Sequence, residues 1–482
     1  MKNDMLENLK RYGQEHLLTF WELLSDLERC KLKDQIESID FSLVNYLYAN
    51  RNVPVESLTL ADLASDPPAY KFSTVTDSVS CKQRKPISSK EAAAAGENML
   101  RCGKVGAILV AGGQGTRLGF NHPKGMYPIG PVSGASLFQI HFEKMLAVSK
   151  RYGYQIPYGI MTSPATHNET VEFLKQNNYF NLREDDIFIF CQGTMPAVAI
   201  DSGKVLLESK GGIALSPDGH GGMLKAVTRK NDKGISILDN FKQRGIEYLF
   251  YNQIDNPLVQ ICSPEFLGYH FLSDSEFTCQ VIRKRFPTDR VGNIVEVNDR
   301  LYVIEYIDLP EAVACQTNSD GSLKIWAGSI AVHIFNVEFL ERMSKIVNSL
   351  SFHIARKRVS FIDISTGKQI KSDKENAIKF ERFIFDLLPF AENAVVVEVD
   401  PFNHYSPLKN VSGSLSDSPE TVKNNITALH TDWLRKAGAI VEPKIPIEIS
   451  PLFADSIESV KQKIKAGTVF NKAAYLSTPS RN

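Results

Sequence analysis

Short apolar segments alternate with amphipathic helical ones from residue 105 onward, and this alternation restricts the chain to an α/β fold. Residues 105–111, VGAILVA, are uniformly apolar and end abruptly in glycines, which is typical of a strand buried on both faces of a parallel sheet. A helical pattern follows near 136–148, an apolar run near 158–162, another helix near 169–176 and another apolar run near 187–191. We therefore predict strands and helices in alternation around a central sheet.

One further segment repeats the strand pattern and then ends in a carboxylate. In residues 246–257, IEYLFYNQIDNP, the apolar residues come first and Asp255 follows them. Ligands in open α/β sheets bind outside the carboxyl ends of the strands, which is where Asp255 falls. An Asp-Asn-Pro sequence by itself is more typical of a turn. The position after a buried strand favours a functional carboxylate.

The regions on either side of this core have different patterns. Residues 1–50 have helical spacing of apolar residues, and residues 66–86 are rich in Pro, Ser and charge, which predicts a linker. From about residue 410 the chain is first Ser- and Asp-rich, then helical, then rich in Pro and Ile. We predict three domains: mainly helical over 1–100, α/β and catalytic over 101–400, and small and partly β over 401–482.

Charge and cysteine usage exclude several classes of protein. The 482 residues carry 55 Lys and Arg against 55 Asp and Glu, and this zero net charge argues against a nucleic-acid or membrane partner. The seven cysteines are scattered and form no C-x-x-C pair, so structural zinc and a disulfide scaffold are not expected. No long uncharged apolar window or signal-like N-terminus is present, which predicts a cytoplasmic protein.

The segment that follows the first strand is rich in glycine and predicts phosphate binding. Residues 111–130 read AGGQGTRLGFNHPKGMYPIG, and the glycines let backbone N–H groups approach an anion. Arg117 and Lys124 add two cations suited to a polyphosphate. The spacing matches neither the dinucleotide fingerprint G-x-G-x-x-G nor a P-loop, which disfavours a dehydrogenase. A plain glycine turn with surface cations is the alternative.

This glycine-rich loop resembles the signature loop of the eukaryotic-type uridylyltransferases, particularly the UDP-N-acetylhexosamine pyrophosphorylase family. Other segments are similar to that family in the same order: GQEHLLTFW (13–21), CQGTMPAV (191–198), LSPDGHGGM (215–223), KFERFIFD (379–386) and YSPLKN (405–410). The resemblance implies a Rossmann-like, glycosyltransferase-A-like nucleotidyltransferase. Such a fold has a central mixed sheet with helices on both faces, an N-terminal helical region and a small C-terminal domain.

The resemblance also implies a reaction. The phosphate of an N-acetylhexosamine 1-phosphate attacks the α-phosphorus of UTP, which yields UDP-N-acetylglucosamine, and UDP-N-acetylgalactosamine as a second product, together with pyrophosphate. Phosphoryl-type transfer depends on positioning and on neutralising charge between attacking and leaving oxygens, which cations and Mg²⁺ can do. The catalytic cations carried over from the family are Arg117, Lys124, Lys379 and Lys409. Asp255 matches the carboxylate for Mg²⁺, or for Mn²⁺ in its place.

The nucleotide-binding positions carried over from the family lie in three segments: Val110, Ala111, Gly112, Gly113, Gln192 and Gly219. An amide such as that of Gln192 can read a pyrimidine edge through one donor and one acceptor. Without the resemblance, a loop-capping role for Gln192 would be the simpler interpretation.

The sugar-binding positions depart from the family in two places. Glu305 and Tyr306 match the pair that holds the hexose hydroxyls, but His220 and Ser329 stand where the family has asparagine. A UTP–glucose-1-phosphate uridylyltransferase that makes UDP-glucose or another UDP-hexose is therefore the first alternative. A catalytically inactive nucleotide-sugar sensor is the alternative of another class. We expect UTP and a hexose 1-phosphate as partners, and a monomer or weak homo-oligomer.

Overall fold

The computed structural model describes residues 2–52, 57–72, 86–346 and 350–478. Contacts divide the chain into two compact units, each discontinuous in sequence. The first comprises Met1–Glu56, Gln192–Ala226 and Asn348–Asp386, and the second Ser57–Cys191, Val227–Val347 and Leu387–Asn482. The predicted boundaries near residues 100 and 400 divide the chain into consecutive stretches, and that three-domain division stays a prediction.

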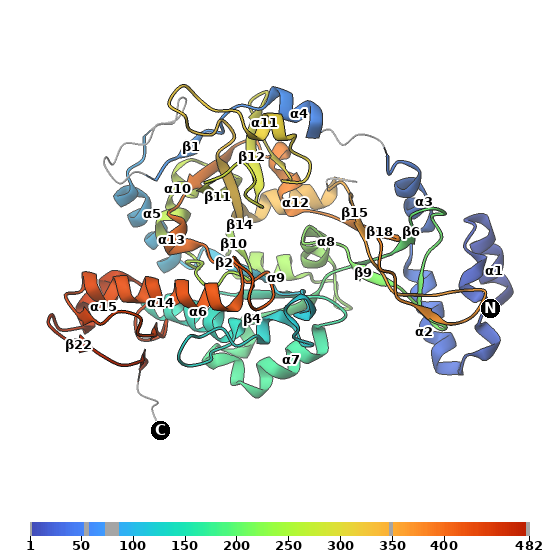
Figure 1. The fold of residues 1–482 in the computed structure, drawn as a ribbon, viewed down its shortest axis with the longest axis horizontal. Helices are drawn as coiled ribbons and strands as arrows, with labels where there is room; N and C mark the ends of the chain where they lie inside the picture. Colours follow the sequence, from blue (N-terminus) through green and yellow to red (C-terminus); the bar gives the residue numbers. More distant parts are fainter. Residues whose placement is uncertain (1, 53–56, 73–85, 347–349, 479–482) are drawn as a thin grey trace. The chain divides into compact units, whose positions relative to one another are not determined.

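The second unit is built on a ten-stranded mixed sheet (Figure 1). Its strands follow the order β1 (Ala69–Tyr70), β19 (Ala394–Glu398), β11 (Phe277–Arg283), β14 (Ala327–Asn336), β10 (Tyr248–Gln253), β2 (Val105–Val110), β3 (Tyr158–Thr162) and β4 (Ile187–Cys191). A hairpin of β12 (Gly292–Val297) and β13 (Arg300–Ile304) joins at β14. The apolar runs predicted at 158–162 and 187–191 are strands with those bounds.

In the strand order from β1 to β4, β14 runs opposite to all the other strands. β10, β2, β3 and β4 run parallel, whereas β14 is antiparallel to both of its neighbours, β10 and β11. The last pair in the β10 register is Tyr251 with His333, so Ala327–Val332 of β14 extends beyond it toward the carboxyl end of β10. A mixed sheet places groups from β14 at the edge where Asp255 follows β10.

Helices bury the sheet on both faces. All residues of β2 from Val105 to Leu109 are buried, as a strand covered on two sides must be. Before the C-terminal segment, the α-helices that lie wholly in this unit are α4 (Ser57–Leu63), α5 (Ser89–Arg101), α6 (Leu137–Tyr152), α7 (His167–Gln176), α9 (Ile237–Gln243), α10 (Pro264–Leu272), α11 (Glu311–Ala314), α12 (Val337–Lys345) and α13 (Pro401–His404). The α/β fold class predicted from the sequence is confirmed.

α6 shows why one of these helices forms where it does. The Ser136 side chain accepts a hydrogen bond from the N–H of Gln139 and caps the first turn. Gly153 ends the helix with a φ of 71°, a left-handed conformation that costs glycine little. Lys150 and Arg151 in the last turn complement the helix dipole. The helix therefore extends four residues past the predicted end near 148.

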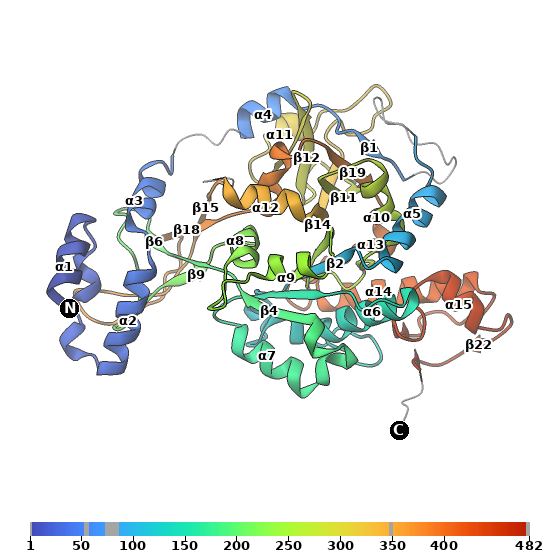
Figure 2. The ribbon, with the colours of Figure 1, turned by 180° about the vertical axis from the view of Figure 1, so that it is seen from behind.

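The C-terminal segment of this unit forms a small cluster of its own. It contains α14 (Pro419–Lys436), β20 (Ile440–Val441), β21 (Ile447–Ile449), α15 (Ile457–Lys463), β22 (Val469–Phe470) and β23 (Ala474–Leu476). Its apolar residues, from Leu434 to Val460, form a separate hydrophobic core. In both views α14 lies side by side with α6 (Figure 1 and Figure 2). The helical and partly β character predicted for this region is confirmed.

The first unit joins segments from three parts of the chain. It contains α1 (Lys2–Arg11), α2 (Asp26–Ser38), α3 (Phe41–Ala49), β5 (Thr194–Pro196), β6 (Val198–Ala199), β7 (Leu207–Ser209), β8 (Gly212–Ile213), β9 (Leu215–Pro217), β15 (His353–Lys357), β16 (Phe361–Ile362), β17 (Gln369–Ile370) and β18 (Ala377–Glu381). α8 (Gly222–Thr228) begins in it. β6 pairs with β18, and both contribute to a core with the N-terminal helices (Figure 2).

Two further sequence interpretations bear on the fold. The linker predicted over 66–86 contains β1, and its residues 73–85, with Cys81, lie outside the described part of the chain. In the described ranges, no helix combines the length and the apolar character that crossing a membrane requires.

Candidate functional site

The glycine-rich loop folds back on itself directly after β2. The N–H of Lys124 donates to the carbonyl of Gly113 at 3.0 Å, and the N–H of Gly115 donates to that of His122 at 2.9 Å. The Ser163 hydroxyl, after β3, donates to the carbonyl of Gly112 at 2.7 Å. These bonds fix the backbone of the loop and bring Lys124 back to the carboxyl end of β2.

Three of the predicted site residues meet at this edge of the sheet. The ammonium of Lys124 donates to the carbonyl of Leu408 at 3.4 Å, and the N–H of Leu408 donates to the carbonyl of Asp255 at 2.8 Å. Lys409 follows Leu408, and the Asp255 carboxylate attracts both lysines. Residues separated by up to 285 positions are thus joined at the carboxyl ends of β2 and β10.

The two lysines have opposite pKa shifts. Burial lowers the pKa of Lys124, and the positive charges of Lys409 and Arg117 act in the same direction against the attraction of Asp255. Burial also acts to lower the pKa of Lys409, but Asp255, Tyr405 and Asp417 outweigh it and raise that pKa. Lys409 is therefore held as a firm cation by its acidic neighbours. Fewer negative charges offset the burial of the Lys124 ammonium, so a bound anion would stabilise its charged form.

Asn256 is a residue of this site that the sequence analysis missed. Its buried amide donates to the carbonyl of His404 at 2.7 Å and accepts from the N–H groups of Leu258 and Ser406 at 3.2 and 3.0 Å. It thereby joins the turn after Asp255 to the segment that leads to Lys409. In the sequence, an Asn next to a Pro indicates only an ordinary turn. The role of Asn256 becomes visible only from its hydrogen bonds to the carbonyl and N–H groups of a remote segment.

We expect Asn256→Ala to lower the free energy of unfolding by about 3 kcal/mol, because three hydrogen bonds at a buried position are lost and their partners stay buried. Chemical denaturation of the purified variant measures this. The matched control is Asn318→Ala in an exposed loop, where we expect a change within about 0.5 kcal/mol. Equal effects of the two substitutions would contradict the role of Asn256.

Two of the predicted sugar-binding residues are neighbours. Glu305 follows β13, and Ser329 lies in β14 opposite Gly292 of β12. A Cβ placed on Gly292 would lie 3.6 Å from a Glu305 carboxylate oxygen and 4.0 Å from the Ser329 Cβ, so this glycine separates the two. Tyr306 is 45% exposed and lies next to Glu305 in sequence. Of these residues, Ser329 belongs to the β14 segment that extends beyond β10, and Glu305 and Tyr306 follow the hairpin of β12 and β13 that pairs with this segment.

In the first unit, the turn at Gly219 lies next to Gln192. The Gln192 amide donates to the carbonyl of Gly219 at 3.3 Å. Gly219 has a φ of 85°, and a Cβ there would lie 2.3 Å from the backbone oxygen of Arg382. Any other residue would be strained and would collide with this backbone. The Pro-Asp-Gly turn is therefore set by its contact with the strand end at Arg382.

His220 is part of an aromatic stack. Its ring lies 5.2 Å from that of Phe383 and 5.5 Å from that of Phe385, and the N–H of Ile384 donates to its Nδ1 at 3.3 Å. Burial, aided by the charge of His353, lowers the pKa of His220 to about 4. The ring is therefore neutral at pH 7, and its Nδ1 accepts a hydrogen bond.

Lys379 lies in β18 of the same unit, three residues before Arg382. Burial lowers the pKa of Lys379, although Glu381 opposes this. The first unit therefore contains four of the predicted site residues: Lys379, Gln192, Gly219 and His220. The other predicted residues, including Arg117, which is exposed, belong to the second.

The donor set of the second unit fits a magnesium ion better than a protein-enclosed metal. In the residues that the structure describes, no group of three His, Cys, Asp or Glu side chains could hold a metal. Mg²⁺ is usually bound by one or two carboxylates together with waters and substrate phosphates. Asp255 supplies one carboxylate at a phosphate-binding loop, with Asp417 near enough to affect the same lysine. The residues present fit this group.

Comparison with known proteins identifies the family. The UDP-N-acetylglucosamine pyrophosphorylase of Saccharomyces cerevisiae is 34% identical over 98% of this chain and 95% of that protein. The UDP-N-acetylglucosamine diphosphorylase 2 of Arabidopsis thaliana is 32% identical over 98% of this chain and 93% of that protein. The chain belongs to the UDP-N-acetylhexosamine pyrophosphorylase family.

Two further comparisons agree with membership in the pyrophosphorylase family. The model of the UTP–glucose-1-phosphate uridylyltransferase family matches residues 70–473. The crystal structure of a candidate UDP-N-acetylglucosamine pyrophosphorylase from Entamoeba histolytica is 33% identical, with a TM-score of 0.73, over 80% of this chain and 96% of that chain. The family resemblance that was noted from the glycine-rich loop is confirmed. The nucleotidyltransferase-like fold with a central mixed sheet, which that resemblance implied, is confirmed as well.

Proposed function

We propose that the protein is a uridylyltransferase that forms UDP-N-acetylglucosamine, and also UDP-N-acetylgalactosamine, with release of pyrophosphate. UTP and the N-acetylhexosamine 1-phosphate are its substrates. Relatives named UDP-N-acetylglucosamine pyrophosphorylase, similar over nearly the whole chain, support this assignment. The observation that carries it is the group of Lys124, Asp255 and Lys409 beside the glycine-rich loop.

In the proposed reaction, a phosphate oxygen of the sugar 1-phosphate forms a bond to the α-phosphorus of UTP. The bond from that phosphorus to the oxygen bridging to the β-phosphate breaks, and pyrophosphate leaves with the electron pair. No proton has to be removed from the attacking phosphate. Lys124 and Lys409 hold positive charge where negative charge accumulates, and Arg117 and Lys379 contact the outer phosphate oxygens.

Mg²⁺, or Mn²⁺ in its place, would be held by Asp255. When bound, it would neutralise negative charge on the phosphates of UTP. Around it, the chain's own residues orient the triphosphate. Asn256 joins the turn after Asp255 to the segment that precedes Lys409, so that the carboxylate and the ammonium keep their spacing.

The remaining positions bind the uridine and the sugar. Backbone N–H groups of the loop that contains Val110, Ala111, Gly112 and Gly113 bind the nucleotide, and Gln192 with Gly219 reads the uracil and ribose. The Glu305 carboxylate accepts hydrogen bonds from two adjacent sugar hydroxyls, with Tyr306, Ser329 and His220 in contact with the sugar. His220 contacts the sugar as a neutral side chain and does not serve as a base.

The second candidate is a UTP–glucose-1-phosphate uridylyltransferase. It rests on the residues at 220 and 329, and the relatives with N-acetylglucosamine names do not favour it. A panel of hexose 1-phosphates with UTP and Mg²⁺, read by pyrophosphate release, separates the candidates. We expect faster turnover of N-acetylglucosamine 1-phosphate. A clear preference for glucose 1-phosphate would overturn the choice, and no release with any sugar would favour an inactive sensor.

We expect His220→Asn to raise the preference for N-acetylglucosamine 1-phosphate over glucose 1-phosphate by about threefold to tenfold, because an amide offers both a donor and an acceptor to the N-acetyl group. The ratio of the two kcat/KM values measures this. Ser202→Asn, at an exposed turn of the same unit, is the control and should leave the ratio unchanged. An unaltered ratio in His220→Asn would exclude contact with the N-acetyl group.

We further propose that the enzyme acts in the cytoplasm as a monomer or weak homo-oligomer, without nucleic-acid or membrane partners. The balanced charge supports this, as does the finding that the six described cysteines form no disulfide. Cell fractionation and light scattering of the purified protein test the location and the oligomeric state.

A further inference from the structure

A cavity of about 530 Å³ lies inside the second unit, among α5, α6, α14, α15 and the turn after Pro257. None of the predicted site residues lines it. Its volume is within the range of ligand-binding pockets, about 300 to 1,000 Å³. Because all its walls belong to one compact unit, its shape is a property of that unit.

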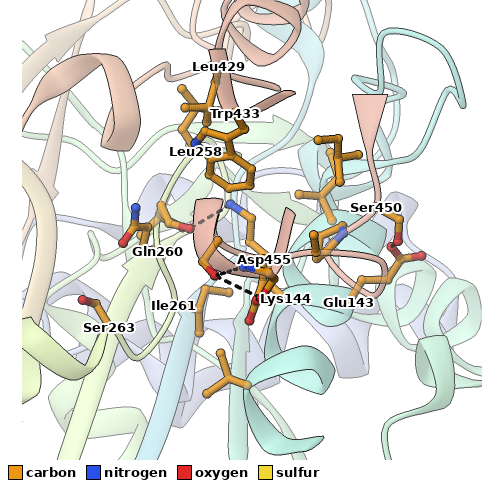
Figure 3. Close-up of a pocket in the computed structure, with 18 of the residues that line it drawn as sticks. Glu143, Lys144, Leu258, Gln260, Ile261, Ser263, Leu429, Trp433, Ser450 and Asp455 are labelled. Carbon is orange, nitrogen blue, oxygen red and sulfur yellow. Dashed lines mark hydrogen bonds between the residues drawn. The ribbon is translucent and has the colours of Figure 1, made fainter. Parts of the chain in front are cut away.

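One part of the cavity wall is apolar and partly aromatic. Leu258, Leu429 and Trp433 lie together in the close-up (Figure 3), and Ile261 lines the cavity as well. Leu258 and Leu429 belong to the main hydrophobic core of the unit, and Trp433 packs against it. The Trp433 ring is 5.6 Å from that of His430. A flat apolar ring would find contacts here of the kind that ligand pockets provide.

Six carboxylates line the cavity, and five of them have partners, including Glu97 with Arg101 and Glu265 with Tyr269; the sixth, Glu458, is exposed. Glu143 accepts hydrogen bonds from Gln139 and Ser450 at 2.8 and 2.9 Å. Glu448 accepts from the N–H groups of residues 132 and 133 and from a serine hydroxyl. Asp455 is paired with Arg151 and accepts from Ser459 (Figure 3). These acids are committed to the fold, so they do not make the cavity a site for cations.

Lys144 is the buried cation of the cavity, whereas Arg151, which also lines it, is paired with Asp455. Its ammonium donates to the carbonyls of Pro257 and Val259 at 2.6 and 2.8 Å, and among the described residues these account for two of its three N–H donors. Burial lowers the pKa of Lys144 to about 7, with Asp455 the one carboxylate that opposes this. Three histidines also face it, and burial holds all of them neutral: His141, His404 and His430.

Lys144 also reaches the turn that carries Asp255. From one face of α6, three residues apart, His141 contacts the carbonyl of Ile254 at 3.2 Å and Lys144 contacts those of Pro257 and Val259. These carbonyls lie on both sides of Asp255. A group that draws the Lys144 ammonium into the cavity would weaken its hold on this turn.

We propose that this cavity binds a small molecule with an apolar aromatic ring and one anionic group, and that its occupancy regulates turnover at Asp255 through Lys144. The ring lies against Leu258, Leu429 and Trp433, and the anionic group accepts the third N–H of Lys144. The effect on turnover rests on the proposed function, whereas the binding does not.

The probe for this site is anilinonaphthalene sulfonate, which combines an apolar ring system with one permanent negative charge. It is titrated into the full chain with saturating UTP and Mg²⁺, so that the nucleotide-binding loop is occupied. We expect saturable binding of one equivalent, with energy transfer from Trp433 that is lost in Trp433→Phe. A signal that saturating UTP abolishes would overturn the proposal, because it would place the probe at the nucleotide site.

Two variants test the assigned contacts. Ala93→Phe places a ring in the cavity from a partly exposed position of α5, and we expect binding to weaken at least about tenfold. Lys144→Met removes the cation and should weaken binding by about the same factor. Circular dichroism verifies that each variant is folded. Unchanged affinity in both folded variants would overturn the site.

The pH dependence separates Lys144 from a general apolar site. A bound anion favours the charged ammonium, so binding is strongest below pH 7 and weakens above it, by up to about tenfold per pH unit. Lys144→Arg stays charged and should bind with no such dependence. At pH 7 the wild-type enzyme should lose turnover severalfold at saturating probe, without competition by UTP. Binding without loss of turnover would overturn the regulatory part alone.

Discussion

Lys124→Ala is expected to lower kcat/KM for UTP and the sugar phosphate by about 100-fold or more, the scale for removing one preorganised charge from a transition state. Lys124 is half-buried, so its charge is poorly screened, and its pKa is lowered by burial and by neighbouring cations. An ammonium in this state gains most when negative charge develops next to it. Steady-state release of pyrophosphate at saturating Mg²⁺ measures the effect.

Lys150→Ala is the matched control for this prediction. Lys150 is exposed in the last turn of α6, in the same unit, and its removal should leave kcat/KM within about twofold. The two variants lose the same charge at different depths. If they had the same activity, Lys124 would be a surface charge and the proposed phosphate contact would be wrong.

Asp255→Asn is expected to remove Mg²⁺-dependent turnover by at least about 100-fold, because the amide cannot supply the negative charge that a divalent cation requires. UTP binding in the absence of metal should be unchanged or tighter, since the carboxylate repels the triphosphate and attracts Lys124 and Lys409. Pyrophosphate release and calorimetric titration of UTP in EDTA measure the two quantities. Loss of turnover without loss of UTP binding distinguishes a metal-binding carboxylate from a structural one.

The control for Asp255→Asn is Asp232→Asn at an exposed turn, which should alter neither quantity. A fold check by chemical denaturation accompanies both variants. The main-chain hydrogen bond from Leu408 to the Asp255 carbonyl is independent of the side chain, so the segment that carries Lys409 should stay in place. A variant that retains full Mg²⁺-dependent turnover would exclude Asp255 from the reaction.

The local elements and the positions of several site residues could be predicted, but the partners of those residues could not. The strands at 158–162 and 187–191 matched their apolar runs, and Asp255 was placed correctly after a strand. Asn256 and Lys144 were not found. Their significance comes from carbonyl and N–H groups in segments over 100 residues away, and no spacing in the sequence marks such contacts.

Strand order was equally inaccessible to local patterns. The sequence analysis did not predict β14, and no local pattern indicates that it runs antiparallel between β10 and β11 or that it brings Ser329 next to Gly292. The discontinuous first unit has the same cause, because β6 and β18 pair across 178 residues of chain. The resemblance to the pyrophosphorylases predicted a mixed sheet, where composition and spacing did not.

The sequence by itself determined the α/β class, the glycine-rich loop and its two cations, and the carboxylate after β10. Each of these features depends on the conformations and side-chain directions of residues that are neighbours in sequence. The alternation of apolar and polar residues, the glycine content and the residues at strand ends indicate such local properties directly. Only the tertiary structure decided that the Asp255 carboxylate attracts both Lys124 and Lys409. It also decided that Asn256 joins the segments of Asp255 and Lys409, and that Lys144 contacts the same turn from a separate cavity. Hydrogen bonds and Coulomb attraction depend on distance in space. Local sequence patterns do not indicate which remote residues will lie close to one another in the folded chain.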